Sequence, residues 1–210
     1  MATKSILLSI QPQWVAKILN GEKTFEIRKK FPAGYRGWVY IYCTKDIGKH
    51  GEKQLLNFFK EDEYFIGRDI DNYDPNDICY LGQNGKVVGR FWCDKVDYIE
   101  FSETDYQWGG IILESPNEEL TNCDNFEKQS CLDFDDAAYY IGLNKVGYAV
   151  HITNVQVFPE PKELKEFKTY TKCKGCSLEH CCNIQQVCSE IKLTTAPQNY
   201  CYIEEAILLW

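Results

Sequence analysis

The stretch Gly21–Arg28, GEKTFEIR, alternates apolar and polar side chains from its middle onward. Such alternation is typical of a β-strand with one buried face, because successive side chains of a strand point to opposite sides. It places Phe25 and Ile27 on one face, and Glu26 and Arg28 on the other. The stretch therefore predicts a strand that presents a carboxylate beside a guanidinium.

Lys23 lies at the mouth of this strand, so an ammonium group joins Glu26 and Arg28. If the polar face points into a barrel opening, the three charges converge. Arg and Lys supply hydrogen-bond donors and Glu supplies acceptors, a combination that can bind a planar base. Burial of Lys23 or Glu26 could also shift a pKa toward acid–base work. The alternative is a solvated strand face with a Glu–Arg pair of little energetic weight.

Short strands and few helices are expected on either side of this stretch. Pro12 suits the first turn of a helix and Asn20-Gly21 is a typical helix end, so a helix should lie between them. Few helices among short strands favour a barrel-like β or α+β domain. Further strands are expected at Ser5–Ile10, Gly37–Thr44, Gly85–Ile99, Gly147–Phe158 (ended by Pro159 and Pro161) and Cys201–Trp210, and further helices at Lys53–Lys60 and Asp133–Ile141.

The composition fits one domain with an insertion or a small appendage. The chain has 210 residues, of which 44% are hydrophobic, so it can bury a substantial core. No run reaches the roughly 18 apolar residues that a membrane helix needs. The first residues, MATKSILLSIQPQW, lack the apolar region and cleavage site of a signal peptide. We therefore expect a cytoplasmic protein with no membrane partner.

Charge is distributed unevenly along the chain, whose net charge is −8 at pH 7. Residues 1–50 contain nine Lys and Arg against three Asp and Glu, whereas residues 61–140 contain five against twenty. Sequence-independent binding to duplex nucleic acid needs a broadly basic surface, which this composition does not supply. A local basic pocket beside an acidic shell is compatible with it. The acidic segment could also dock a basic protein partner or imitate nucleic acid.

Six of the eleven cysteines crowd into the segment from Cys173 to Cys201. A secreted disulfide protein usually spreads its cysteines across the fold, so clustering in a chain without a signal peptide favours a metal site. The five scattered cysteines are expected to act as small buried hydrophobic residues. These are Cys43, Cys79, Cys93, Cys123 and Cys131.

The clustered cysteines have a spacing that suits zinc. Cys173 and Cys176 form a C-x2-C turn that points two thiolates at one centre, and Cys182 and Cys188 can complete a tetrahedron, with Cys181 as an alternate ligand. The surrounding sequence is polar, so metal binding would supply the stability that it lacks. We expect a structural zinc site. Reduced cysteines in a tight loop, disulfides formed during purification and an iron–sulfur cluster are the alternatives.

Three motifs in order resemble ASCH proteins of the PUA-like group. LLSIQPQWVAKILNGEKTFEIRKKFP at 7–32 is similar to their opening strand, helix and G-x-K-x-x-E-x-R turn. YAVHITNVQVFPEPKELKEF at 148–167 is similar to a later strand of the family that contains a histidine. APQNYCYIEE at 196–205 is similar to the P-Q-S-W-C-Y-V-E signature of a phage and bacterial subgroup, which also carries a cysteine-rich insert.

The resemblance implies an α+β fold, a PUA-like β-barrel flanked by a few short helices, with a cleft beside the first helix. The ASCH barrel would then comprise residues 1–165 and 192–210. Acidic surface insertions are expected at about 49–83 and 102–130, and a small cysteine-rich, zinc-binding appendage at 166–191.

PUA-like relatives often bind RNA or modified bases, so the resemblance implies binding of RNA, a nucleotide or a modified nucleoside in the cleft. Some small ASCH proteins are amidohydrolases of acetylated cytidine that use a Lys, a Thr and a Glu in a G-x-K-T-x-T-x-R motif. Lys23 and Arg28 match that motif, but Glu26 replaces the nucleophilic Thr. Thr24, which the alternation places on the face of Glu26, matches the other Thr. A hydrolase of the amidohydrolase or ribonuclease type using Lys23, Glu26 and Thr24 is therefore the alternative to a binding module.

Other candidate ligand-binding residues come from the same motifs. Trp14 could stack on a base, although an aromatic residue in a first helix is more often core. His151 sits among apolar residues and is interpreted first as a structural histidine, then as a ligand contact. Gln198 and Tyr202 could contact a base edge, and Tyr202 could equally be a packing residue.

Overall fold

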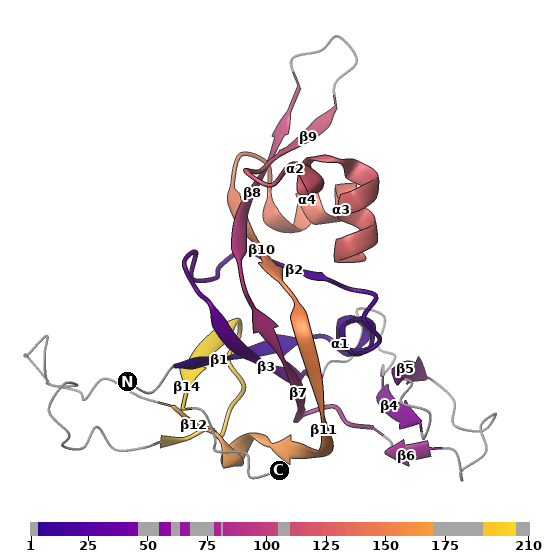
Figure 1. Ribbon diagram of the computed structural model, residues 1–210, viewed down its shortest axis with the longest axis vertical. Coiled ribbons are helices and arrows are strands. Elements are labelled where there is room, and N and C mark those ends of the chain that lie inside the picture. The colour runs from indigo at the N-terminus through magenta and orange to yellow at the C-terminus, as the bar shows by residue number, and fades with distance from the viewer. Residues whose placement is uncertain are drawn as a thin grey trace, which may run out of the picture.

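The computed structural model describes residues 4–45, 55–59, 64–67, 78–80, 82–104, 110–169 and 191–204. Within them the chain forms three β-sheets and a few short helices, which confirms the expected α+β class (Figure 1). The largest sheet has seven strands, in the order β11-β7-β3-β1-β14-β12-β13. Their bounds are β1 Ser5–Ile10, β3 Gly37–Cys43, β7 Lys86–Cys93, β11 Thr153–Glu163, β12 Lys168–Thr169, β13 Ile191–Lys192 and β14 Tyr200–Ile203.

The second sheet has four strands in the order β2-β10-β8-β9, and the helices α2, α3 and α4 pack on one face of it (Figure 1). A three-stranded sheet in the order β5-β4-β6 lies beside α1. The strands are β2 Phe25–Arg28, β8 Val96–Glu103, β9 Ile111–Glu114, β10 Val146–His151, β4 Leu55–Phe59, β5 Tyr64–Gly67 and β6 Ile78–Tyr80. The helices are α1 Pro12–Leu19, α2 Glu118–Thr121, α3 Cys123–Ser130, α4 Phe134–Ile141 and the 3₁₀ turn η1 Leu164–Glu166.

Two long stretches of chain pass from the seven-stranded sheet to the four-stranded one. β7 runs into β8 through Asp94 and Lys95, and β10 runs into β11 through Ile152. The two connections are linked, because the His151 N–H donates to Lys95 O at 3.1 Å. Each of the single strands expected at Gly85–Ile99 and Gly147–Phe158 is therefore two. Among the described strands no pairing joins the two sheets, so the barrel is open rather than closed.

Apolar side chains gather into three cores. The main core lies between α1 and the seven-stranded sheet, the upper core lies between the four-stranded sheet and the helices α2–α4, and the lower core lies on the other face of the large sheet. Representative buried residues are Ile6, Leu8, Val15, Ile18 and Phe91 in the main core, Phe25, Ile27, Phe101, Leu120 and Phe126 in the upper core, and Leu7, Tyr40, Tyr42, Phe158 and Phe167 in the lower core.

The ends of the helices follow from local chemistry. Pro12 opens α1, where a missing backbone N–H costs nothing, and Gly21 takes a φ of +75° just after the helix, as expected. Asp133 caps α4 by accepting from the N–H groups of Asp135 and Asp136. The expected helix at Asp133–Ile141 is thereby confirmed.

Two local expectations are wrong. Lys53–Lys60 is not a helix, because Leu55–Phe59 forms the central strand of the three-stranded sheet. β11 continues past Pro159 and Pro161 to Glu163. Its pairing with β7 is irregular between Val157 and Lys162, so neither proline has to donate to the ladder.

The acidic segment expected as a surface insertion at 102–130 contributes to the fold. It contains β9, α2 and α3, and it places Leu113, Leu120 and Phe126 in the upper core. Phe126 has no exposed surface, and its ring meets Phe101 and Phe134 edge to face at 5.9 and 5.8 Å. The segment therefore combines an acidic composition with apolar side chains that help to build the upper core.

Truncating Phe126 should therefore destabilise the whole domain. Phe126→Ala is expected to lower the free energy of unfolding by about 3–5 kcal/mol, because it removes a fully buried ring and leaves a cavity. Urea denaturation measures the change. Tyr139→Ala is the control, since Tyr139 is 89% exposed and should shift the value by less than about 0.5 kcal/mol. Similar small losses for both variants would contradict the packing of α3.

Candidate functional site

The end of α1 and the start of β2 place Lys23. The backbone N–H groups of Glu22 and Lys23 both donate to Lys17 O, at 2.9 and 3.1 Å, and fold the chain back under the helix. Thr24 then bonds on both sides, since its N–H donates to Gln129 O and its carbonyl accepts from Ile152, each at 2.9 Å. β2 continues from there as a neighbour of β10.

The alternation in β2 is as expected from the sequence. Phe25 and Ile27 pack into the upper core, and Glu26 and Arg28 point to the opposite side. The structure brings Lys23, Glu26 and Arg28 together, and all three are buried, with 2, 5 and 8% of their surface exposed. We call these three residues the Lys23 cluster. The alternative prediction, a solvent-exposed strand face, is therefore wrong for these residues.

Glu26 is held between the two cations. Its Oε1 lies 2.9 Å from Arg28 Nη2, and its Oε2 lies 3.6 Å from Lys23 Nζ. Each cation also donates to a backbone carbonyl, Lys23 Nζ to Ser130 O and Arg28 Nη2 to Ser9 O at 2.6 Å. Ser130 ends α3, where the helix dipole favours a positive charge. The cluster therefore ties the ends of β1, α1 and α3 to β2.

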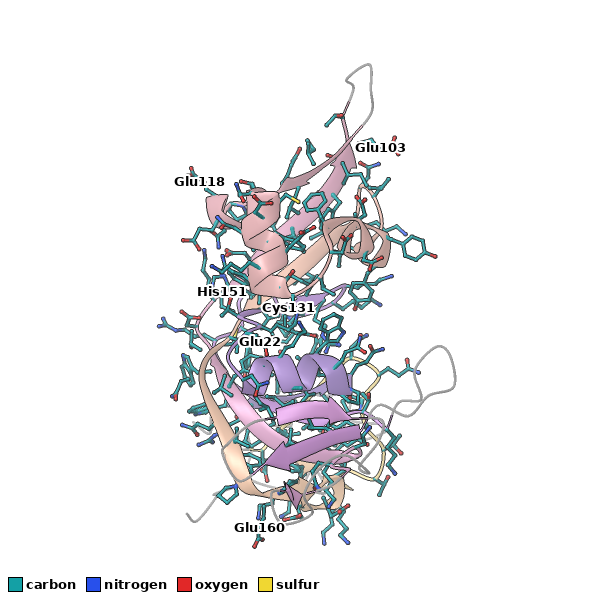
Figure 2. All side chains as sticks on the ribbon, turned by 90° about the vertical axis from the view of Figure 1, so that its right-hand side faces the viewer. Glu22, Glu103, Glu118, Cys131, His151 and Glu160 are labelled. Carbon is teal, nitrogen blue, oxygen red and sulfur yellow. The ribbon has the colours of Figure 1, made fainter. Side chains whose placement is uncertain are left out.

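Burial governs the electrostatics of the cluster. Desolvation lowers the pKa of Lys23 below its ordinary value, against the opposing influence of Glu26 and Cys131. Cys131 lies close by, with its Sγ donating to Glu22 O at 3.6 Å, and Figure 2 shows both residues between α1 and the helices above it. Arg28 Nε is buried and has no hydrogen-bond partner among the described residues. Two buried cations thus share one carboxylate, and one guanidinium donor is left over within the described part of the chain.

Trp14 lies next to the cluster. Lys23 Nζ sits 5.2 Å from the centre of its ring, within the range of a cation–π contact. The side chain is half-buried and packs against the main core. Trp14 therefore combines core packing with a place at the edge of the charged group.

His151 belongs to a different polar group. Its Nε2 lies 2.8 Å from Asp97 Oδ2, and Asp97 also contacts Lys95 Nζ at 2.8 Å and Asn117 Nδ2 at 3.0 Å. Burial pushes the pKa of Asp97 upward, but the hydrogen bonds from Lys95, His151 and Asn117 lower it overall. The His151 ring also meets Phe25 edge to face at 4.5 Å. These contacts fix the His151 ring beside Asp97 and Phe25.

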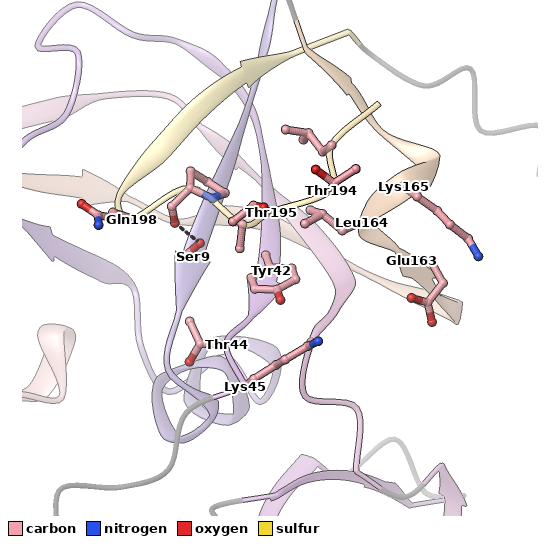
Figure 3. Close-up of a pocket in the computed structure, with 14 residues that line it drawn as sticks. Ser9, Tyr42, Thr44, Lys45, Glu163, Leu164, Lys165, Thr194, Thr195 and Gln198 are labelled. Carbon is pink, nitrogen blue, oxygen red and sulfur yellow. Dashed lines mark hydrogen bonds between the residues drawn. The ribbon is translucent and has the colours of Figure 1, made fainter. Parts of the chain in front are cut away.

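Among the described residues, no hydrogen bond or ion pair joins the side chains of the remaining candidates to the Lys23 cluster. Gln198 lines a cavity beside Ser9 (Figure 3), and Tyr202 is 40% exposed on β14, with its ring against Tyr200. Thr24 is exposed, and its hydroxyl lies 3.4 Å from Gln129 Oε1.

Thr24 directly precedes β2, which begins at Phe25. Its side chain lies at the surface, whereas Glu26 is buried. Thr24 therefore lies outside the buried Lys23 cluster, although the alternation expects it on the face of Glu26.

The sequence did not predict the two backbone carbonyls that accept hydrogen bonds from Lys23 and Arg28. The carbonyls of Ser9 and Ser130 carry no signal in the sequence, because any residue could supply them. Asp97 could have been found, since it is a carboxylate on the face of β8 that also carries the apolar Ile99 and Phe101, and it is 3% exposed.

The cysteine site expected at Cys173, Cys176, Cys182 and Cys188, with Cys181 as alternate, lies outside the described residues. Among the residues that the structure does describe, no group of three or more His, Cys, Asp or Glu is placed to hold a metal. Cys43 and Cys93 are fully buried as expected, and desolvation raises the pKa of each thiol to about 12. Cys123 is exposed, so the expectation of burial is wrong for it.

Comparison with known proteins gives a likeness of fold. No protein-family model matches the chain, and no curated protein matches it. An ASCH structure from Zymomonas mobilis is similar at 14% identity and a TM-score of 0.44, covering 77% of this chain and 74% of that one. Two point mutants of the Zymomonas protein match at 13 and 14% identity, with TM-scores of 0.44 and 0.46, covering 77 and 95% of this chain and 77 and 87% of theirs.

At identities of 13–14% and TM-scores of 0.44–0.46, these likenesses assign neither a family nor a role to the chain. Across the described part of the chain, no helix is long and apolar enough to cross a membrane.

Glu26→Gln should destabilise the protein strongly. The substitution leaves Lys23 and Arg28 buried without a countercharge, which costs about 3–5 kcal/mol of unfolding free energy. Urea denaturation provides the measurement. Glu22→Gln is the matched control, since Glu22 forms an exposed pair with Lys17 at 3.7 Å and its loss should cost less than about 1 kcal/mol. Equal effects of the two variants would show that Glu26 does not compensate buried charge.

The pKa of Lys23 predicts a dependence of stability on pH. Its folded pKa lies below the unfolded value of about 10.4, so between the two values the unfolded chain binds the extra proton. The contribution of Lys23 to the free energy of unfolding therefore increases as the pH rises across that window. Unfolding free energies measured from about pH 7 to about pH 10.4 should rise more for the wild type than for Lys23→Met. Parallel curves would contradict the lowered pKa.

Proposed function

We propose that the chain binds RNA, a nucleotide or a modified nucleoside through the base, at the Lys23 cluster. The observation that carries this proposal is the surplus of buried donors. Two cations share one carboxylate, and Arg28 Nε lacks a partner among the described residues. A buried donor without an acceptor costs free energy, and a ligand that supplies the acceptor recovers it.

A nucleobase suits this arrangement chemically. Carbonyl oxygens and ring nitrogens of a base are acceptors for the guanidinium of Arg28 and the ammonium of Lys23, and an exocyclic amine is a donor for Glu26. Trp14 offers an aromatic face beside Lys23, on which a base can stack. The three charged residues are almost fully buried. The ligand would therefore reach them by passing the half-buried side chain of Trp14.

The distribution of charge favours a small ligand or a single strand over a duplex. The chain carries a net charge of −8, and a protein that coats a duplex through its phosphates needs a positive surface. A pocket that reads one base needs only local donors. Docking of a basic protein partner on the acidic segment at 61–140 is a separate proposal, which this site neither needs nor excludes.

A hydrolase acting on a modified nucleoside or on RNA is the second candidate, and the pKa of Lys23 is the observation that favours it. A lowered pKa increases the neutral amine fraction, which can accept a proton. Glu26 at 3.6 Å is a partner for that proton. Thr24 lies outside this pair, so the hydrolase alternative uses Lys23 and Glu26 alone.

Ligand binding is tested by isothermal calorimetry and thermal shift with a panel of nucleosides, nucleotides and short single-stranded RNAs. A saturable signal is expected for the wild type, and Lys23→Met and Arg28→Met should weaken it at least about tenfold, the effect of losing one charge-assisted hydrogen bond. Lys17→Met is the matched control, since Lys17 is exposed on α1 and outside the cluster.

The same panel distinguishes binding from catalysis. Release of acetate from an acetylated nucleoside, or cleavage of the RNA, that disappears in Lys23→Met supports the hydrolase. Binding without turnover supports the binding module. No saturable signal with any member of the panel contradicts both.

We also propose that the segment with Cys173, Cys176, Cys182 and Cys188 holds a structural zinc ion. Freshly purified, reduced protein should then contain about one equivalent of zinc, and Cys173→Ser should lower that content. Metal analysis by mass spectrometry measures both. Less than about half an equivalent in the wild type would contradict a closed four-ligand site.

A further inference from the structure

A cavity of about 700 Å³ lies on the far side of β1 from the main core (Figure 3). Its walls come from the ends of β1 and β3, from η1 and from residues 193–198. None of the residues of the Lys23 cluster lines it. We call it the Ser9 pocket. Ser9 lines it and also accepts a hydrogen bond from Arg28 of the cluster.

Ser9 fixes one wall of the pocket. Its Oγ donates to Pro197 O at 2.6 Å (Figure 3). Its N–H donates to Asn199 O at 3.2 Å, and its carbonyl accepts from Arg28. These bonds hold the segment that carries Gln198 against β1. The Ser9 pocket is therefore a built feature, with its wall anchored by hydrogen bonds to a central strand.

The floor of the pocket is apolar. Tyr42, Leu164, Leu193 and Ala196 line it, and the same residues pack in or against the lower core. An apolar floor of this kind suits the flat or aliphatic body of a small organic molecule.

Threonine residues line the rim of the pocket, and the hydroxyl of one of them, Thr44, is buried without a partner within the described part of the chain. Thr44 Oγ1 is buried and makes no hydrogen bond there, although the Thr44 N–H bonds to Ile10 O at 2.9 Å. Buried hydroxyl groups normally find a partner, so an orphan at the edge of a cavity points to a ligand. Thr194 and Thr195 add two more hydroxyl groups.

Lys45 brings a positive charge to the same rim. Its aliphatic stem lies over Gly85, where an added Cβ would come within 2.7 Å of Lys45 Cε. Gly85 has a φ of +86° and donates to Cys43 O at 2.8 Å, so this turn is fixed and the lysine lies across it toward the pocket (Figure 3).

The described lining of the pocket is positive overall. Its carboxylate, Glu163, caps η1 by accepting from the Glu166 N–H, so it is already engaged. Lys45 and Lys165 supply the positive charge, with Lys165 at the outer edge in Figure 3. The pocket therefore offers positive charge and hydroxyl donors above an apolar floor.

We infer that the Ser9 pocket binds a small organic phosphate monoester. The phosphate would accept from Thr44 Oγ1 and pair with Lys45, and the organic body would lie on Tyr42 and Leu164. A phosphate supplies several strong acceptors and a charge that offsets the two lysines. This site is separate from the proposed nucleobase site and does not depend on it.

The test uses phenyl phosphate, which has an apolar body and a phosphate but no nucleobase for the Lys23 cluster. Calorimetry should show saturable binding at one site, with weaker binding of phenol and of inorganic phosphate. Thr44→Val and Lys45→Gln should each raise the dissociation constant about tenfold, the effect of one charge-assisted hydrogen bond. Thr44→Val keeps the branched shape of the side chain and removes a buried hydroxyl without a described partner, so the fold should be retained.

Controls separate this pocket from the nucleobase site. Lys23→Met should leave the binding of phenyl phosphate unchanged, and Lys45→Gln should leave the binding of nucleosides unchanged. No binding of phenyl phosphate, or binding that survives both pocket variants, would overturn the inference while leaving the nucleobase proposal intact.

A final comparison identifies the source of the phosphate. A dinucleotide with a 5′-phosphate is compared with its 5′-hydroxyl form in the Lys23→Met background. Tighter binding of the phosphorylated form supports the pocket as a receptor for an RNA end. Equal binding of the two forms, alongside binding of phenyl phosphate, supports a receptor for free small phosphates.

Discussion

A carboxylate buried between two cations is the interaction on which this structure depends. Removing an ion from water costs several kcal/mol even after relaxation, so Lys23, Glu26 and Arg28 can remain inside only if they compensate one another. Their arrangement also fixes backbone, because each cation donates to a carbonyl near the end of another element, Ser130 of α3 or Ser9 of β1. The same three side chains thus join the upper core to the main core and present a donor for the proposed ligand.

That constraint explains why the polar sites lie where they do. Ser9 contributes to both the Lys23 cluster and the Ser9 pocket. Its carbonyl accepts from Arg28, and its hydroxyl donates to Pro197 in the segment that forms one wall of the pocket. His151 sits on the opposite face of β2 and β10 from Glu26 and Val150 and is satisfied by Asp97. The strand β2 therefore separates the buried Lys23 cluster on one face from the hydrogen bond between His151 and Asp97 on the other.

Much of this arrangement follows from the sequence, and the remainder has identifiable causes. The alternation in β2 predicted which side chains share a face, because every second side chain of a strand points to the same side. Full burial of those charges was not predictable, since it requires α3 and β1, which are distant in sequence, to cover them. Leu55–Phe59 was mistaken for a helix because a short apolar run has no distinct period. The bends near Lys95 and Ile152 split two expected strands through long-range pairing with different sheets.

The side-chain resonance of Arg28 Nε–H offers the most direct test of base binding at the Lys23 cluster, because this donor is the one that the ligand is proposed to satisfy. Nitrogen-15 labelled protein is titrated with the best ligand of the nucleotide panel, and the resonance is assigned with Arg28→Lys. A saturable downfield shift of that resonance is expected, with the same dissociation constant as calorimetry gives. A resonance that stays unchanged while the ligand binds would contradict the proposed contact.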